Sequence, residues 1–437
     1  MIGKRPFLMQ RAFSLLLAVL TLALFMPGCG TNIQRESEPV PKADTSSQEN
    51  GDIPVLRILI DLTIGEDTSS KCADVELFLT SHVEGCGTDF TVEVEALPTI
   101  SEPDKRNPLL TGLHMELMTG GPDLFIMRNF ANDMGLYTDL KNFFPYPTSA
   151  MRQRLFLPLD EYIERDDNAD WGRLQPTLLE AGKLDGSQQI VPLSYSITAA
   201  LVDCDKYTPS ETFPMDWQQM LNSSDPVIQQ ASYNQIDMLG VLADYSKEEL
   251  AFSEEDLLKY LQKIHEIRQS LDYTELDTWG MQQSIMLCPL NDSILYADEE
   301  SNFWMIPTYN QKGGVTARVD TFAAISRNTE YPEEAYSILR ALISKEYQQT
   351  GIGFRLPVYT GLGQDGASIG GGWYLDEWDY HQLKSLQEQI NAVEFTTPLS
   401  NEMESLFREC SRMDDETELQ EAVHDAYARM RMMLAES

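Results

Sequence analysis

The chain has 437 residues, with 32 basic and 69 acidic side chains and a formal net charge of -37 at pH 7. Hydrophobic residues make up 42% of it and aromatic residues 9%, a composition typical of a globular protein and not of a disordered chain. The length allows two or three domains. So large an acidic excess argues against nucleic acid as a partner, because the capture of phosphates needs clustered Lys and Arg.

The first 28 residues have the layout of a secretory signal peptide. Three basic residues precede the apolar run Ala12 to Met26, which is shorter than the roughly 20 residues of a membrane-spanning helix. Residues 24–29 resemble a bacterial lipobox, which implies cleavage after Gly28 and lipid attachment to Cys29. Residues 29–53 are rich in Ser, Glu, Pro and Gln and predict a flexible tether. We therefore expect a lipid-anchored protein on the extracellular face of the cell membrane.

Three apolar runs follow the tether, with helix-length segments between them. Val55 to Leu62 is almost continuously apolar, Phe90 to Leu97 alternates apolar and polar residues, and Asp123 to Met127 forms the third run. The intervening helices are expected at Asp74 to His82 and around Leu109 to Met118. Alternation of strand and helix predicts a doubly wound α/β sheet.

The rest of the chain continues the mixed α/β pattern. A helix is expected where Ser253 precedes Asp256 by three residues, and another where Pro332 is followed by two glutamates. The further predicted elements are short strands at Ile190–Leu193 and Thr198–Val202, strands at Trp304–Tyr309 and Thr321–Ser326, and an amphipathic helix with apolar positions from Leu419 to Leu434.

The sequence contains no complete motif for a metal or a cofactor. No Cys or His spacing suits a zinc site, and the Asp166 to Asp170 segment opens like a calcium loop but lacks the turn glycine and the final glutamate. Gly361 to Gly366 matches G-x-G-x-x-G, but a glycine-rich stretch follows it where the mechanism needs a helix. We expect no metal and no cofactor.

Five cysteines remain after Cys29, an odd number that cannot pair completely within one chain. Cys72 and Cys86 flank the predicted helix at Asp74 to His82. A disulfide between them would require that helix to be short or bent, because helix ends separate by 1.5 Å per residue.

The order of several short motifs resembles the family 1 extracellular solute-binding proteins, the lipid-anchored receptors of ATP-driven importers. The resemblance spans residues 54–437, and residues 141–156 stand out as an insertion. The matching motifs are Met118–Phe125 (MTGGPDLF), Leu157–Ile163 (LPLDEYI), Leu184–Gly186 with Ile190–Leu193, Asp216–Trp217, Ile306–Pro307, Phe322–Ser326, Tyr331–Tyr336 and Leu356–Val358.

The family implies two α/β lobes, joined by crossing strands, with a hinge and a ligand cleft between them. Mapped onto this chain, lobe one takes residues 54–195 plus 322–355, and lobe two takes residues 197–320 plus 356–437.

Candidate ligand-binding residues follow from the ends of the predicted strands, because ligands of open α/β sheets bind beyond the carboxyl ends of strands. Arg, Asn and Asp suit the recognition of hydroxyl groups, and a tryptophan offers a face on which a sugar ring stacks. A role in a surface loop is the alternative for each of them. The candidates are Asp61, Thr63, Arg128, Asn129, Tyr195, Asn291, Asp292, Asp320, Thr321 and Trp373.

The resemblance implies a monomeric solute-binding lipoprotein that captures a small molecule, most simply an oligosaccharide, and delivers it to the permease of an ABC importer without catalysis. One alternative is a surface glycoside hydrolase, although abundant carboxylates carry little weight because that chemistry needs only two of them. A second is a receptor that presents its closed form to a sensor protein. Peptide, polyamine or metal ligands also remain open, and an acidic cleft would favour polyamines.

Overall fold

The computed structural model divides into two units, Met1–Asp52 and Ile53–Ser437, and the second is described here. The predicted signal peptide, the lipidation residue Cys29 and the tether up to residue 52 lie outside the described residues. The described residues are 53–62, 68–86, 89–99, 102–117, 119–130, 141–167, 169–204, 216–225, 228–229, 236–270, 285–289, 303–350, 356–364, 368–370, 373–374, 377–410, 412–413 and 415–437.

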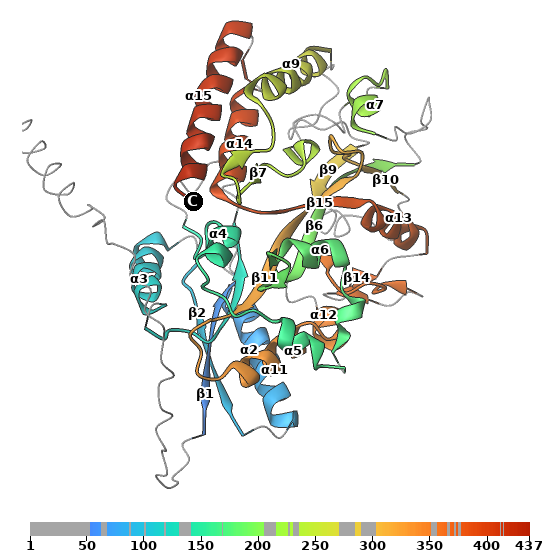
Figure 1. The fold of residues 1–437 in the computed structure, drawn as a ribbon. Coiled ribbons are helices and arrows are strands. Elements are labelled where there is room, and N and C mark those ends of the chain that lie inside the picture. The colour runs from blue at the N-terminus through green and yellow to red at the C-terminus, as the bar shows by residue number, and fades with distance from the viewer. Residues whose placement is uncertain are drawn as a thin grey trace, which may run out of the picture. The chain divides into compact units, whose positions relative to one another are not determined.

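Three parallel strands begin the fold. They are β1 (Val55–Asp61), β2 (Thr91–Ala96) and β3 (Leu124–Arg128), in the order β3-β1-β2. The helices α2 (Thr68–Cys86) and α3 (Pro103–Glu116) connect them (Figure 1). The predicted strand and helix alternation is confirmed. β3 is buried throughout and β1 over most of its length, whereas β2, at the edge, is half-exposed, which explains its alternating Val and Glu residues.

α2 is longer than predicted and contains both Cys72 and Cys86. In one continuous helix their Cα atoms are separated by about 21 Å, far beyond the span of a disulfide. Cys72 is a free, buried thiol. The α2 helix therefore excludes the disulfide that the sequence left open.

Two long strands cross the fold and change partners along their length. β6 (Ile190–Asp203) pairs first with β11 (Val315–Ile325), and then with β9 (Ile285–Pro289) and β10 (Phe303–Pro307). β11 pairs in its first half with β15 (Ile390–Phe395) and in its second half with β3. The short strand β12 (Leu356–Pro357) joins β6 beside the point of change.

The prediction of two short strands within β6 was wrong. The segment is one strand, and Pro192 interrupts nothing because it lies beside an irregularity of the β6–β11 ladder, where a residue without an N–H group is tolerated. The run predicted at Thr321 likewise begins earlier, at Val315, because Val315, Ala317 and Val319 are buried against the neighbouring elements.

Helices cover the sheet and make up most of the described residues outside the strands. α2 and α11 pack against each other, and α15 packs against α14 and α9 (Figure 1). The remaining helices are α4 (Pro147–Arg152), α5 (Asp160–Glu164), α6 (Pro176–Ala181), α7 (Trp217–Leu221), α9 (Glu254–Ser270), α11 (Pro332–Leu342), α12 (Lys345–Thr350), α13 (Glu377–Glu388), α14 (Pro398–Cys410) and α15 (Glu416–Ala435), with the 3-10 turns η2 (Asp170–Arg173) and η3 (Ile236–Leu239).

Three small hairpins complete the described strands. Their bounds are β4 (Lys183–Leu184) with β5 (Ser187–Gln188), β7 (Ala243–Asp244) with β8 (Glu249–Leu250), and β13 (Ser368–Gly370) with β14 (Trp373–Tyr374).

The predicted start of α9 is confirmed in atomic detail. The Asp256 N–H donates to Ser253 Oγ (3.1 Å), and the Ser253 N–H donates back to the Asp256 carboxylate (3.4 Å). This reciprocal arrangement is a capping box, and it satisfies amide groups that have no partner within the helix.

The predicted insertion is part of the hydrophobic core. Phe143, Phe144 and Phe156 are at most 3% exposed and pack with Phe125 of β3 and Phe322 of β11. Residues 141–156 therefore fold together with the central sheet.

Two features are absent from the described residues. None of their helices combines the length and the apolar character that a membrane crossing requires. In that same part of the chain, no group of three or more His, Cys, Asp or Glu side chains is arranged to hold a metal ion.

Candidate functional site

The carboxyl ends of β1, β2 and β3, at Asp61, Ala96 and Arg128, lie at one edge of the sheet, which we call the carboxyl edge. β1 and β3 run in register there, with Asp61 opposite Met127. Polar side chains that end parallel strands therefore gather at this edge, as the sequence predicted.

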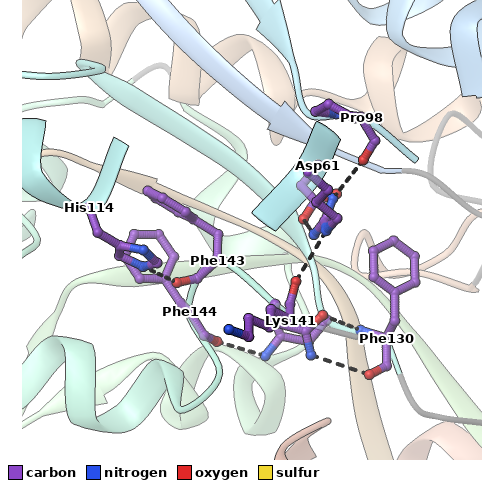
Figure 2. Close-up of polar contacts among 10 residues, drawn as sticks. Asp61, Pro98, His114, Phe130, Lys141, Phe143 and Phe144 are labelled. Atoms are coloured by element: carbon purple, nitrogen blue, oxygen red, sulfur yellow. Dashed lines mark hydrogen bonds and ion pairs between the residues drawn. The ribbon is translucent and has the colours of Figure 1, made fainter. Parts of the chain in front are cut away.

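Asp61 is held in a buried ion pair. Its carboxylate receives two hydrogen bonds from the Arg106 guanidinium of α3, at 3.0 and 2.5 Å, and both residues are 1% exposed. Arg106 also donates to the carbonyl oxygens of Pro98 (2.9 Å) and Lys141 (3.1 Å), as Figure 2 shows. The geometry thus makes Asp61 a structural partner of Arg106.

The Asp61 carboxylate also acts on a neighbouring thiol. Burial, together with the negative charges of Asp61 and Glu76, raises the pKa of Cys72 to about 11. Since only the thiolate is nucleophilic, Cys72 is a buried and unreactive thiol at neutral pH.

Arg128 and Asp320 form a second ion pair at the point where β11 changes partners. The Arg128 Nη2 atom lies 2.8 Å from Asp320 Oδ1, and the two side chains are 6% and 10% exposed. Thr321 Oγ1 (3.2 Å) and Ser194 Oγ (3.4 Å) donate to the same carboxylate. The guanidinium also lies over the ring of Phe130, 5.6 Å from its centroid. This cluster joins β3, β6 and β11.

Asn129 connects two segments that are distant in sequence. Its amide nitrogen donates to the carbonyl oxygens of Phe144 (2.9 Å) and Thr396 (2.8 Å). Beside it, Asn142 accepts from the Phe130 N–H and donates to the Phe130 carbonyl oxygen (Figure 2). Both asparagines are buried, so their amides satisfy backbone groups that are shielded from water.

Tyr195 lies on β6, next to Ser194. Its ring is 1% exposed, and its hydroxyl accepts a hydrogen bond from Gln387 Nε2 at 2.8 Å. Burial raises the pKa of Tyr195, so the hydroxyl stays neutral.

The first half of β11 carries a charge cluster that the sequence did not predict. Arg318 binds Asp237 of η3 (2.5 Å) and approaches Glu404 of α14 (3.4 Å). Glu394 of β15 lies opposite Arg318 in register and accepts the Leu242 N–H. The pKa of Glu394 is raised to about 7, chiefly by burial and in addition by the charge of Asp237, against the opposing effects of the Leu242 hydrogen bond and Arg318.

The sequence contains a signal that could have revealed this cluster, namely charged residues inside otherwise apolar strands. Arg318 and Glu394 each stand in a strand whose other residues are largely buried. A charge in such a strand indicates a buried partner, because an unpaired buried charge is costly.

The structure brings some of the sequence candidates together. Arg128, Asp320 and Thr321 meet in one cluster, with Asn129 next in the chain. Asp61 ends the neighbouring strand, and Tyr195 follows Ser194 of the same cluster. Thr63, Asn291 and Asp292 lie outside the described residues, and of Trp373 only the backbone, in β14, is described. A direct role in ligand binding stays a prediction for all ten.

Comparison with known proteins places this architecture in a class. The sequence matches no protein-family model and no curated protein sequence. Solved structures, in contrast, match over most of the chain, and they include extracellular solute-binding proteins of family 1. The chain has the α/β fold of those proteins, as its motifs predicted.

The matching structures include the following three proteins, which are named for solute binding. The family 1 extracellular solute-binding protein of Alicyclobacillus acidocaldarius has a TM-score of 0.58 at 14% identity, and the match covers 88% of this chain and 100% of that one. The periplasmic oligogalacturonide-binding protein of Yersinia enterocolitica gives 0.58 at 14%, covering 87% and 99%. The cyclic α-maltosyl-1,6-maltose-binding protein of Arthrobacter globiformis gives 0.57 at 16%, covering 88% and 100%.

The matching structures also include a de novo designed cysteine esterase, with a TM-score of 0.58 at 13% identity and coverage of 88% and 99%. The fold by itself therefore does not decide between a binding protein and an enzyme.

Proposed function

We propose that this protein is an extracellular solute-binding lipoprotein of an ABC importer. It captures an oligosaccharide in a cleft between two lobes and delivers it to the permease without catalysis. Lobe one consists of residues 54–195 plus 322–355, and lobe two of residues 197–320 plus 356–437.

The observation that carries this proposal is the change of partners along β6 and β11. β6 leaves β11 after Ser194 and joins β9 from Thr198 and β10 from Ala199 onward. β11 leaves β15 after Val319 and joins β3 from Thr321 onward. β6 and β11 therefore each run from one set of strands into another. Such continuous connections between two sets of strands are the arrangement that hinge closure around a ligand needs.

The solute class is supported by the structural comparison. The matched proteins of Yersinia enterocolitica and Arthrobacter globiformis are an oligogalacturonide-binding protein and a cyclic maltosyl-maltose-binding protein. Anchoring at Cys29 is supported by the lipobox-like segment 24–29 and the tether that follows it.

Thermal unfolding with candidate ligands tests the proposal. A protein that begins after Cys29 is melted alone and with millimolar oligosaccharides, amino acids, peptides and polyamines. A ligand at 100 times its dissociation constant stabilises the folded state by about 2.7 kcal/mol, which raises the melting temperature measurably. We expect a shift with one class of sugar only.

Recovery of the ligand separates binding from catalysis. The proposal predicts that chromatography returns the sugar intact after long incubation. Hydrolysis that disappears on substitution of a single carboxylate would favour a glycoside hydrolase. A shift with polyamines and with no sugar would replace the proposed solute class, and permease genes beside this gene would favour transport over sensing.

Lipid attachment is tested separately on the full chain. The wild type is expected to partition into detergent and to carry the mass of an acylated Cys29, whereas Cys29→Ser is expected to stay in the aqueous phase. Equal partitioning of the two proteins would contradict the anchor.

A further inference from the structure

The Arg106 guanidinium connects three segments of chain that meet at the carboxyl edge. It donates to the carboxylate of Asp61, the last residue of β1, and to the carbonyl oxygens of Pro98, after β2, and Lys141. Among the hydrogen bonds described at the carboxyl edge, no other side chain bonds to all three segments. A single side chain thus bonds to all three segments (Figure 2) and adds to the backbone ladder that already pairs β1 with β2.

The segment that begins at Lys141 carries this constraint to β3. Asn142 accepts from the Phe130 N–H (3.0 Å) and donates to the Phe130 carbonyl oxygen (3.2 Å), two residues beyond the end of the strand. His114, from the same helix as Arg106, donates from Nε2 to the Phe143 carbonyl oxygen (2.7 Å) and stacks on the Phe143 ring. The Arg106 contacts therefore reach all three strand ends of the edge.

The chemistry of the site requires arginine. Arg106 and Asp61 are both 1% exposed, so solvent does not weaken their attraction. The planar guanidinium group directs two parallel hydrogen bonds to one carboxylate and further hydrogen bonds to two carbonyl groups. A lysine ammonium group keeps the charge but cannot make this set of hydrogen bonds. Arg106 is also too deeply buried to touch a ligand itself.

We propose that Arg106 is a positioning residue of the ligand site: through Asp61, Pro98 and Lys141 it fixes the carboxyl edge in the geometry that binds solute. The proposal rests on the proposed function for the location of the solute, and the fixing of the edge is tested without any ligand.

Hydrogen exchange measures the fixing of the edge directly. The Leu97 N–H bonds to the Ile60 carbonyl oxygen and the Phe130 N–H bonds to Asn142, so both report on the carboxyl edge. The Thr91 and Asp123 amides bond to the carbonyl oxygens of Pro54 and Arg57 and report on the opposite edge of the same strands.

The variants are Arg106→Met, Arg106→Lys and the neutral pair Asp61→Asn with Arg106→Gln. The matched control is Arg57→Met, because Arg57 also links β1 to β2 and α3, through Glu95 and Glu116, but is 42% exposed. We expect Arg106→Met to speed exchange at Leu97 and Phe130 by roughly 100-fold relative to Thr91 and Asp123. The Lys variant and the neutral pair should fall between it and the wild type, and Arg57→Met should change none of the four.

Equal acceleration at both edges, or none, would overturn the proposal, since either result would give Arg106 a role in global stability only. Arg106→Lys and the neutral pair keep the test valid if Arg106→Met does not fold.

Binding is then measured with maltotriose and trigalacturonate as probes. Arg106→Lys is expected to weaken the binding of the active probe by at least about 10-fold, because misplaced polar groups lose their hydrogen bonds, while Arg57→Met binds as the wild type does. Unchanged affinity in Arg106→Lys would refute the positioning role. If the wild type binds neither probe, the failure concerns the proposed solute, and the exchange data decide the fixing of the edge independently.

Discussion

Glu394 is expected to lower the free energy of unfolding as the pH rises, which is the opposite of the usual effect of a paired carboxylate. Most paired carboxylates stabilise a fold at neutral pH, but burial raises the pKa of Glu394 from 4.5 to about 7. Folding then favours the protonated form, so the contribution of Glu394 to stability is largest below pH 4.5 and is lost as the pH rises to 7. The shift corresponds to a cost of about 3 kcal/mol above pH 7. Arg318, Asp237 and Tyr245 are the titratable and charged groups that interact with it.

Glu394→Gln tests this directly, because the glutamine oxygen still accepts the Leu242 N–H. We expect the free energy of unfolding of the variant to exceed that of the wild type by no more than about 1 kcal/mol near pH 5 and by about 3 kcal/mol at pH 8. Urea unfolding between pH 5 and pH 8, followed by circular dichroism and tryptophan fluorescence together, measures the difference. Exposed Glu421→Gln in α15 corrects for removing one negative charge. Parallel pH profiles for Glu394→Gln and the wild type would show that the pKa of Glu394 does not rise on folding.

Three further predictions follow from described contacts. Arg318→Met removes the guanidinium that pairs with Asp237 and Glu404 and is expected to lower the free energy of unfolding by about 3 kcal/mol, measured by urea unfolding. Arg165→Ala, which breaks the exposed pair with Glu333, should have no measurable effect, and equal losses in the two variants would contradict this ranking. Ser253→Ala removes the capping box of α9 and is expected to lower the free energy of unfolding by about 1 kcal/mol, with an unchanged value as the opposing result. Cys72 and Cys410 are buried, which raises their pKa values to about 11 and about 12, so iodoacetamide at pH 8 should modify them only after denaturation, as peptide mass spectrometry would reveal.

The strands β1 and β3 could be predicted because the sequence pattern that marks each of them is local. β1 and β3 are apolar runs bounded by polar residues, and both are largely or fully buried. β6 was harder, because the sequence predicted two short strands in its place, and the irregularity that accommodates Pro192 lies in the partner ladder with β11. Information about a neighbouring strand is not present in the segment itself.

The candidate site shows the same limit. The ends of the apolar runs pointed to Asp61, Arg128 and Asn129, and the structure places all three at the carboxyl edge. Their partners were out of reach, because Arg106 is 45 residues from Asp61 and Thr396 is 267 residues from Asn129. Sequence patterns therefore located polar residues at the carboxyl edge but did not show which other groups of the chain these side chains bond to.

Under the proposed function, a solute binds between two lobes and contacts both. Hydrogen exchange with and without the sugar that raises the melting temperature tests it most directly. We expect simultaneous protection at the end of β3, around residues 127–130, and at the strand crossings, around residues 194–198 and 319–321. Protection confined to one of the two lobes, or located away from these segments, would contradict it.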